Sequence, residues 1–167
     1  MKIDIKQRFT GAVKFTTEIE APEDAPASVK MRLAVLGAIE NKVDLSRSDL
    51  SGCDLSDCDL SGSDLIDCDL SGSDLSRSNL SDCDLFRSNL TDCDLFRSNL
   101  RDCDLRVLQT DIWTVYVQKD TIRIGCQYHS ISDWGQFTDG QIANMHGRAL
   151  IWWKLWKDII FAIHATI

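Results

Sequence analysis

Leucine recurs at every fifth position from Leu45 to Leu105, thirteen times without a change of phase. Each leucine follows an Asp or Asn, and the residue before that is Ser or Cys in every unit except the first, which has Val43. A five-residue period fits neither the turn of an α-helix nor the alternation of a strand. It predicts a four-sided coil of about twenty residues per turn, stacked at ~4.8 Å. The small residue and the leucine point inward, and the Asp or Asn between them points outward.

The unit Ser/Cys–Asp/Asn–Leu–x–x resembles the repeat of the pentapeptide-repeat family, whose usual first residue is Ala. The resemblance covers residues 43–107 and implies a right-handed quadrilateral β-helix of about three coils. Ser and Cys are small enough for the inward position, although a buried Ser hydroxyl needs a hydrogen-bond partner. Six of the seven cysteines take this position, which predicts packed, reduced thiols rather than a metal or redox site: Cys53, Cys58, Cys68, Cys83, Cys93 and Cys103.

Residues 1–42 are expected to form an N-terminal cap on the first coil. Apolar residues alternate on both sides of Thr10-Gly11, which predicts a β-hairpin. Ser28 is the expected N-cap of a helix that ends near Ile39. This hairpin and helix resemble the module that precedes many bacterial and phage pentapeptide repeats.

Residues 108–167 are expected to form a C-terminal α/β cap. Strands are predicted at 112–118 and 121–126, and a short helix after Ser132. Thr138 and Gln141 fit a capping box that starts one long amphipathic helix reaching the C-terminal residues. The stretch 124–134 resembles a segment of phage and prophage proteins. The whole chain is therefore predicted to be mainly β, a solenoid with a cap at each end.

The apolar face of the long helix contains three tryptophans within five residues. Three partners for this face remain open: the end of the solenoid, a second protomer in a homodimer, or another protein or membrane surface. The residues expected to make this contact are Trp152, Trp153, Trp156 and Ile160.

The acidity of the chain is concentrated in the repeats. The net charge is −8, and residues 43–107 hold fifteen Asp and six Arg with no Glu or Lys, a net −9. This balance excludes direct nucleic-acid binding through a basic surface and favours a basic partner. Folding the sequence by twenty places Arg47, Asp67 and Arg87 in one column, which predicts an ion ladder. It also stacks carboxylates on two opposite faces: Asp44, Asp64, Asp84 and Asp104 on one, and Asp54, Asp74 and Asp94 on the other.

The charge density of the repeats is close to that of a DNA duplex. About three coils give a rod roughly 16 Å long, and B-DNA carries roughly nine charges over that length. Two interpretations remain open: the carboxylates imitate phosphates, or Asp suits the outward turn and keeps the rod in solution. Phe86 and Phe96 also point outward by register and predict an exposed apolar spot near Ile66.

The rest of the sequence argues against an enzyme. Cys126 and His129 have C-x-x-H spacing, but no further ligand or third catalytic group stands near them, so no metal, cofactor or catalytic residue is predicted. Seven cysteines without a secretory signal predict a reducing, cytoplasmic location. No apolar run reaches the ~18 residues of a membrane span.

The sequence therefore predicts a non-enzymatic, acidic protein-interaction module. The charge density favours DNA mimicry directed at a basic, nucleic-acid-handling protein, either topoisomerase-like or a phage or host defence target. The resemblance adds that some pentapeptide-repeat proteins bind type II topoisomerases, but family membership alone does not carry that function. The alternative is a structural or assembly protein that forms a homodimer or docks through the tryptophan-rich helix.

Overall fold

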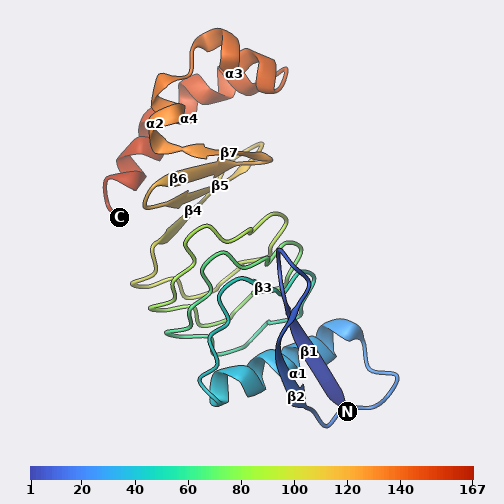
Figure 1. Cartoon of the computed structure of the whole chain (residues 1–167). Coiled ribbons are helices and arrows are strands. Elements are labelled where there is room, and N and C mark those ends of the chain that lie inside the picture. Colours follow the sequence, from blue (N-terminus) through green and yellow to red (C-terminus); the bar gives the residue numbers. More distant parts are fainter. The chain divides into compact units, whose positions relative to one another are not determined.

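The structure is a computed structural model that describes residues 1–167. It divides into two compact units, Met1–Cys103 and Asp104–Ile167, and each is described by itself (Figure 1). The first unit contains the hairpin, one helix and the repeats. The second contains a small sheet and three helices.

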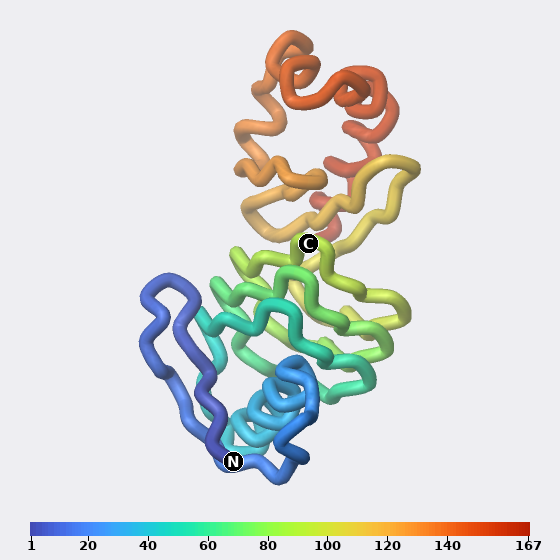
Figure 2. Tube along the Cα trace, turned by 90° about the vertical axis from the view of Figure 1, so that its right-hand side faces the viewer, coloured from blue at the N-terminus to red at the C-terminus, as the bar shows by residue number.

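The first unit begins with strands β1 (Lys2–Gln7) and β2 (Val13–Glu18), paired antiparallel where the sequence predicts a hairpin. Gly11 has a φ of +69°, which glycine adopts without steric cost in the connecting turn. On its other edge β1 pairs with β3 (Ser48–Asp49), so the hairpin is joined to the first coil (Figure 2).

Helix α1 (Ala27–Glu40) starts earlier than predicted. Its N-cap is Pro26 and not Ser28, which lies within the first turn. Proline is compatible with this position because its ring fixes φ close to the observed −53°. Gly37 faces the hairpin closely, since a Cβ there would be 3.2 Å from Thr17 Oγ1.

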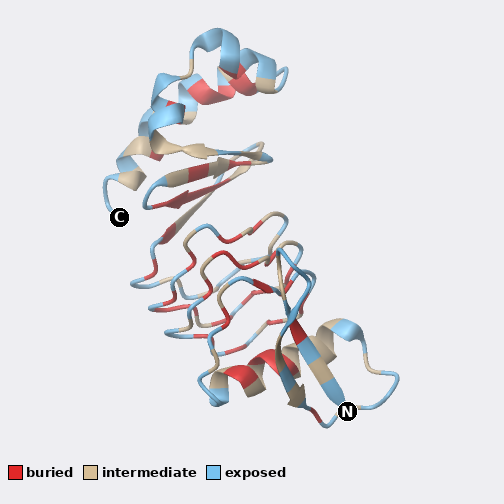
Figure 3. Ribbon diagram, in the orientation of Figure 1, coloured by how far each residue is buried: buried red, intermediate tan, exposed pale blue.

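The repeats form a β-helix-like solenoid. Seven parallel bridges each join residues twenty positions apart, from Asp49↔Asp69 to Asn79↔Asn99, which confirms four units per coil. Leu45 and the nine leucines up to Leu90 are buried, and buried and exposed residues alternate along the coils (Figure 3). Leu95 and Leu100 are half-buried. The inward register of the leucines is thus confirmed in the first unit.

The second unit contains an antiparallel four-stranded sheet in the order β4-β5-β6-β7. Its strands are β4 (Leu105–Gln109), β5 (Thr114–Gln118), β6 (Thr121–Ile124) and β7 (Gln127–Ser130). Only the middle two were predicted. Strand β4 begins on the last leucine of the five-residue pattern, and β7, with the sequence QYHS, lacks the apolar alternation of a typical strand.

Three helices follow the sheet: α2 (Ile131–Gln136), α3 (Asp139–Met145) and α4 (Ala149–His164). The capping box of Thr138 and Gln141 is confirmed at the start of α3. The prediction of one long helix from that point is wrong. His146 has extended backbone angles and Gly147 follows it, so the chain leaves the helical conformation and re-enters it at Ala149.

Candidate interaction surfaces

The outward Asp and Asn side chains have a defined role in the solenoid turns. In all twelve repeats from Asp44 to Asn99, one side-chain oxygen accepts a hydrogen bond from the backbone N–H two residues later, at 2.7–3.3 Å. This Asx turn starts each corner of the coil.

Asparagine performs this role as well as aspartate. Asn79, Asn89 and Asn99 accept the same backbone bond. Their amides also donate to the residue one coil earlier, as in Asn79 Nδ2 to Asp59 Oδ1 at 3.1 Å and Asn89 Nδ2 to Asp69 Oδ1 at 3.0 Å. The fold therefore needs an acceptor at these positions, and it does not need a charge.

Basic residues from the first 32 positions neutralise the acids of the early coils. Three ion pairs do so: Lys14 Nζ lies 3.4 Å from Asp44, Arg32 Nη1 lies 3.4 Å from Asp54, and Arg8 Nε lies 3.6 Å from Asp69. A hydrogen bond from the Ser56 hydroxyl lowers the pKa of Asp54, and the charge of Arg32 adds to this effect. These pairs could not be predicted from the sequence, because the partners are distant along the chain.

The later carboxylates have no such basic partner among the ion pairs of the structure. Asp64 and Asp84 stack on one face of the solenoid, and Asp74 and Asp94 on the opposite face. Asp104, predicted to extend the first column, belongs to the second unit. In each predicted column, the carboxylates without an ion pair are therefore those of the later coils: Asp64 and Asp84 in one, and Asp74 and Asp94 in the other.

Charged residues occupy the corners of the solenoid, where the backbone has a positive φ. The second corner residue has a left-handed φ in each repeat. It is glycine in three early repeats, which alternate with charged residues, and it is charged in every repeat after Gly72. Asp67, nearly buried, lies between Arg47 Nε at 3.7 Å and Arg87 Nε at 3.1 Å, so the predicted ion ladder is confirmed.

The two phenylalanines are not equivalent. Phe96 is 63% exposed, as the register predicts, whereas Phe86 is half-buried. The guanidinium carbon of Arg97 lies 5.0 Å from the centre of the Phe96 ring. This distance is typical of a cation–π contact.

Several inward Ser and Cys side chains donate to leucine carbonyl oxygens of the preceding coil. The Ser73 hydroxyl donates to the Leu50 carbonyl oxygen at 2.7 Å, and the Cys83 thiol donates to that of Leu60 at 2.9 Å. Burial raises the pKa of Cys53 and of Cys68 to about 12. Alone among the inward hydroxyls, the Ser48 oxygen is buried without a partner.

Cys126 and His129 are not brought together as a reactive pair. Cys126 is exposed, while His129 Nε2 lies 3.1 Å from Gln127 Oε1. The His129 ring packs edge-on against Trp134 and Phe137. The imidazole therefore takes part in the packing of the second unit.

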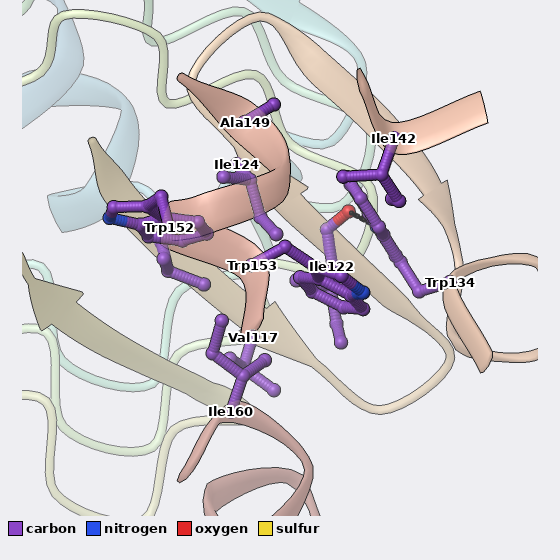
Figure 4. Packing of buried hydrophobic residues seen from close by; sticks show 10 residues of the cluster. Val117, Ile122, Ile124, Trp134, Ile142, Ala149, Trp152, Trp153 and Ile160 are labelled. Carbon is purple, nitrogen blue, oxygen red and sulfur yellow. Dashed lines mark hydrogen bonds between the residues drawn. The ribbon is translucent and has the colours of Figure 1, made fainter. Parts of the chain in front are cut away.

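The predicted contact face of the C-terminal helix requires correction. Trp152, Trp153 and Ile160 are buried in the core of their own unit, against the sheet residues Val117 and Ile122 (Figure 4). Trp156 is half-buried at the edge of this core. These side chains do not offer a free surface, because the sheet of the same unit covers them.

A different apolar face of α4 is exposed. Ile151 is 73% exposed, Leu155 68% and Ile159 46%. Their spacing of four residues places them in one stripe. This four-residue spacing of apolar residues is visible in the sequence. Because α4 is apolar on two sides, the face with the tryptophans was predicted as the contact face instead. None of the helices combines the length and the apolar character needed to cross a membrane.

Comparisons with known proteins identify the repeats. The family model for pentapeptide repeats matches residues 44–82 and 63–102, in eight copies. One matching solved structure is HetL, a pentapeptide-repeat protein involved in the regulation of heterocyst differentiation in the cyanobacterium Nostoc. The match has 30% identity and a TM-score of 0.24, and it covers 36% of this chain and 33% of HetL.

A search of curated proteins finds no match. The family match and the buried, evenly spaced leucines agree over the same residues. Residues 44–102 of this chain therefore belong to the pentapeptide-repeat family.

Proposed function

We propose that this chain is a non-enzymatic protein-interaction module whose later coils bind a basic protein. The binding groups are the free carboxylates of Asp64 and Asp84 on one face and of Asp74 and Asp94 on the other. The observation that carries the proposal is the equivalence of Asp and Asn in the turns. Since an amide serves the fold equally well, the stacked charges are an addition to what the fold requires.

Stacked carboxylates are costly to the free protein. Like charges one coil apart repel each other, and an Asn in the same column would instead donate a hydrogen bond. Proteins retain such local costs at functional sites. A basic partner would relieve the repulsion on binding, as it does when it neutralises DNA phosphates.

The partner class that fits this surface is a DNA-binding protein, with the carboxylates in the place of phosphates. The test compares the wild type with a variant in which Asp64, Asp74, Asp84 and Asp94 are all changed to Asn. Both are immobilised and exposed to a bacterial lysate and to purified DNA gyrase. We expect the wild type alone to retain proteins that salt and duplex DNA displace. Equal capture by the two forms, or capture insensitive to salt, would reject the proposal.

A second candidate function is assembly through the exposed stripe of α4. The stripe of Ile151, Leu155 and Ile159 is exposed along α4. An exposed apolar stripe along one helix suits a self-complementary contact between two copies of the chain. Sedimentation tests it: Leu155→Ser and Ile151→Ser should convert a dimer to a monomer. A wild type that sediments as a monomer at high concentration would exclude it.

A further inference from the structure

The later coils contain an exact duplication of nine residues. Residues 82–90 and residues 92–100 both read DCDLFRSNL. The copies are ten residues apart, which is half of the twenty-residue coil, so they lie on opposite sides of the solenoid. We name them by their aromatic residues: the Phe86 cluster consists of Asp82, Asp84, Phe86 and Arg87, and the Phe96 cluster of Asp92, Asp94, Phe96 and Arg97.

The fold does not require phenylalanine at these positions. In most other repeats the same position is Ser or Thr, with Ile66 and Arg101 as exceptions. In four of these repeats the hydroxyl donates to the Asx side chain, as Ser56 does to Asp54 at 2.6 Å and Ser71 to Asp69 at 2.7 Å. Phe86 and Phe96 keep only the backbone bond to that side chain, at 2.9 and 2.8 Å. Each phenylalanine thus gives up a hydrogen bond and exposes apolar surface to water.

The replacement of Ser or Thr by Phe produces a surface that combines an aromatic ring with a carboxylate. An aromatic ring stands beside a carboxylate that has one donor fewer than Asp54 or Asp69. Arg97 already lies against the Phe96 ring, so the ring is accessible to a guanidinium group. A complementary partner segment therefore carries Arg or Lys for the carboxylate and ring, and an apolar side chain for the remaining ring surface.

We infer that each chain binds two copies of the same basic, partly apolar protein segment, one at the Phe86 cluster and one at the Phe96 cluster. This bivalence rests on the proposed function and extends it. The Phe96 site is the stronger of the two. Phe86 is half-buried, and its neighbour Arg87 is held by Asp67 at 3.1 Å, whereas Phe96 is mostly exposed.

The test counts bound probes per chain. The probe is a short, fluorescently labelled synthetic peptide rich in arginine and leucine, and the readouts are calorimetric titration and sedimentation. We expect two peptides per wild-type chain, one per chain for Phe86→Ser or Phe96→Ser, and none for the double variant. Serine restores the hydrogen bond found at equivalent turns, so these variants retain the fold. Phe96→Ser removes the tighter site.

The matched control is Ile66→Ser, which lies in the column of Phe86 but outside the duplication. It should still bind two peptides. One peptide per wild-type chain, with binding lost on changing the four carboxylates to Asn, would contradict bivalence and leave the proposed function standing. No peptide binding by the wild type at low salt would contradict both. Two peptides bound by the double Phe variant would also overturn the inference.

Discussion

Changing Asp74 to Asn should make the first unit more stable. Asp74 lies between Asp54 and Asp94 in one column, joined to each by a parallel bridge. At the ~4.8 Å spacing of stacked strands, each carboxylate pair repels by about 0.9 kcal/mol in water. Physiological salt roughly halves this value. Because Arg32 pairs with Asp54 and offsets part of its charge, neutralising the central member recovers about 0.5–1 kcal/mol from the two pairs.

The introduced amide should add a hydrogen bond. Asn79 and Asn89 each donate to the carboxylate one coil earlier, at 3.1 and 3.0 Å, and an amide at position 74 has the same neighbour in Asp54. An exposed hydrogen bond contributes about 0.5–1 kcal/mol. The two effects together predict a gain of about 1–2 kcal/mol for Asp74→Asn.

The assay must report the first unit alone. All five tryptophans lie in the second unit, so their fluorescence does not follow the solenoid. Six of the seven cysteines lie in the first unit, and their labelling during urea denaturation follows its unfolding. Asp74→Ala is the control, because it removes the charge and also the turn acceptor. It should lie about 1–2 kcal/mol below the Asn variant.

Destabilisation by Asp74→Asn would refute the reasoning, because it would mean that the fold depends on the charge itself. The stabilisation should also shrink as salt is added, since salt screens the repulsion that the substitution relieves. A gain that is the same at low and high salt would contradict the repulsion argument.

Three further predictions concern other parts of the chain. In the native protein only Cys126 should react quickly with a thiol reagent, because the other cysteines are inward and burial raises the pKa of Cys53 and Cys93 to about 12; fast labelling of several thiols would contradict this packing. The free energy of unfolding should fall as the pH rises from about 8.5 toward 12, because thiols of the unfolded chain lose protons that the buried thiols keep. It should also fall below about pH 4, because the lowered pKa of Asp54 and of Asp59 no longer favours the folded state once these carboxylates are protonated. Urea titrations at a series of pH values check both limits. Gly62→Ala should cost about 1 kcal/mol through its positive φ alone, and Gly125→Ala should cost more, because its Cβ would lie 2.8 Å from Trp113 Cδ1; equal losses in thermal unfolding would contradict the contact.

The repeat could be predicted because its information is local. Every unit has the same pattern of inward and outward residues. The five-residue period therefore places Leu45 to Leu90 in the core without any knowledge of contacts between distant segments. The ion ladder at Asp67 followed from the same register.

Features that depend on contacts between distant segments could not be predicted in this way. The pairs of Lys14 with Asp44 and of Arg32 with Asp54 arise from how the N-terminal hairpin and helix meet the coils. Which of the two apolar faces of α4 is buried also depends on contacts between distant segments. Trp153 and Leu155 are both apolar, and only the sheet of the second unit decides that the first is buried and the second exposed.

The most direct measurement compares stability and partner binding in the variant with Asp64, Asp74, Asp84 and Asp94 changed to Asn. We predict that thiol labelling in urea gives a free energy of unfolding at least equal to that of the wild type. We also predict that capture of DNA-displaceable proteins from lysate is lost. A variant that unfolds more readily, or that binds as well as the wild type, would contradict the claim that these charges serve recognition rather than folding.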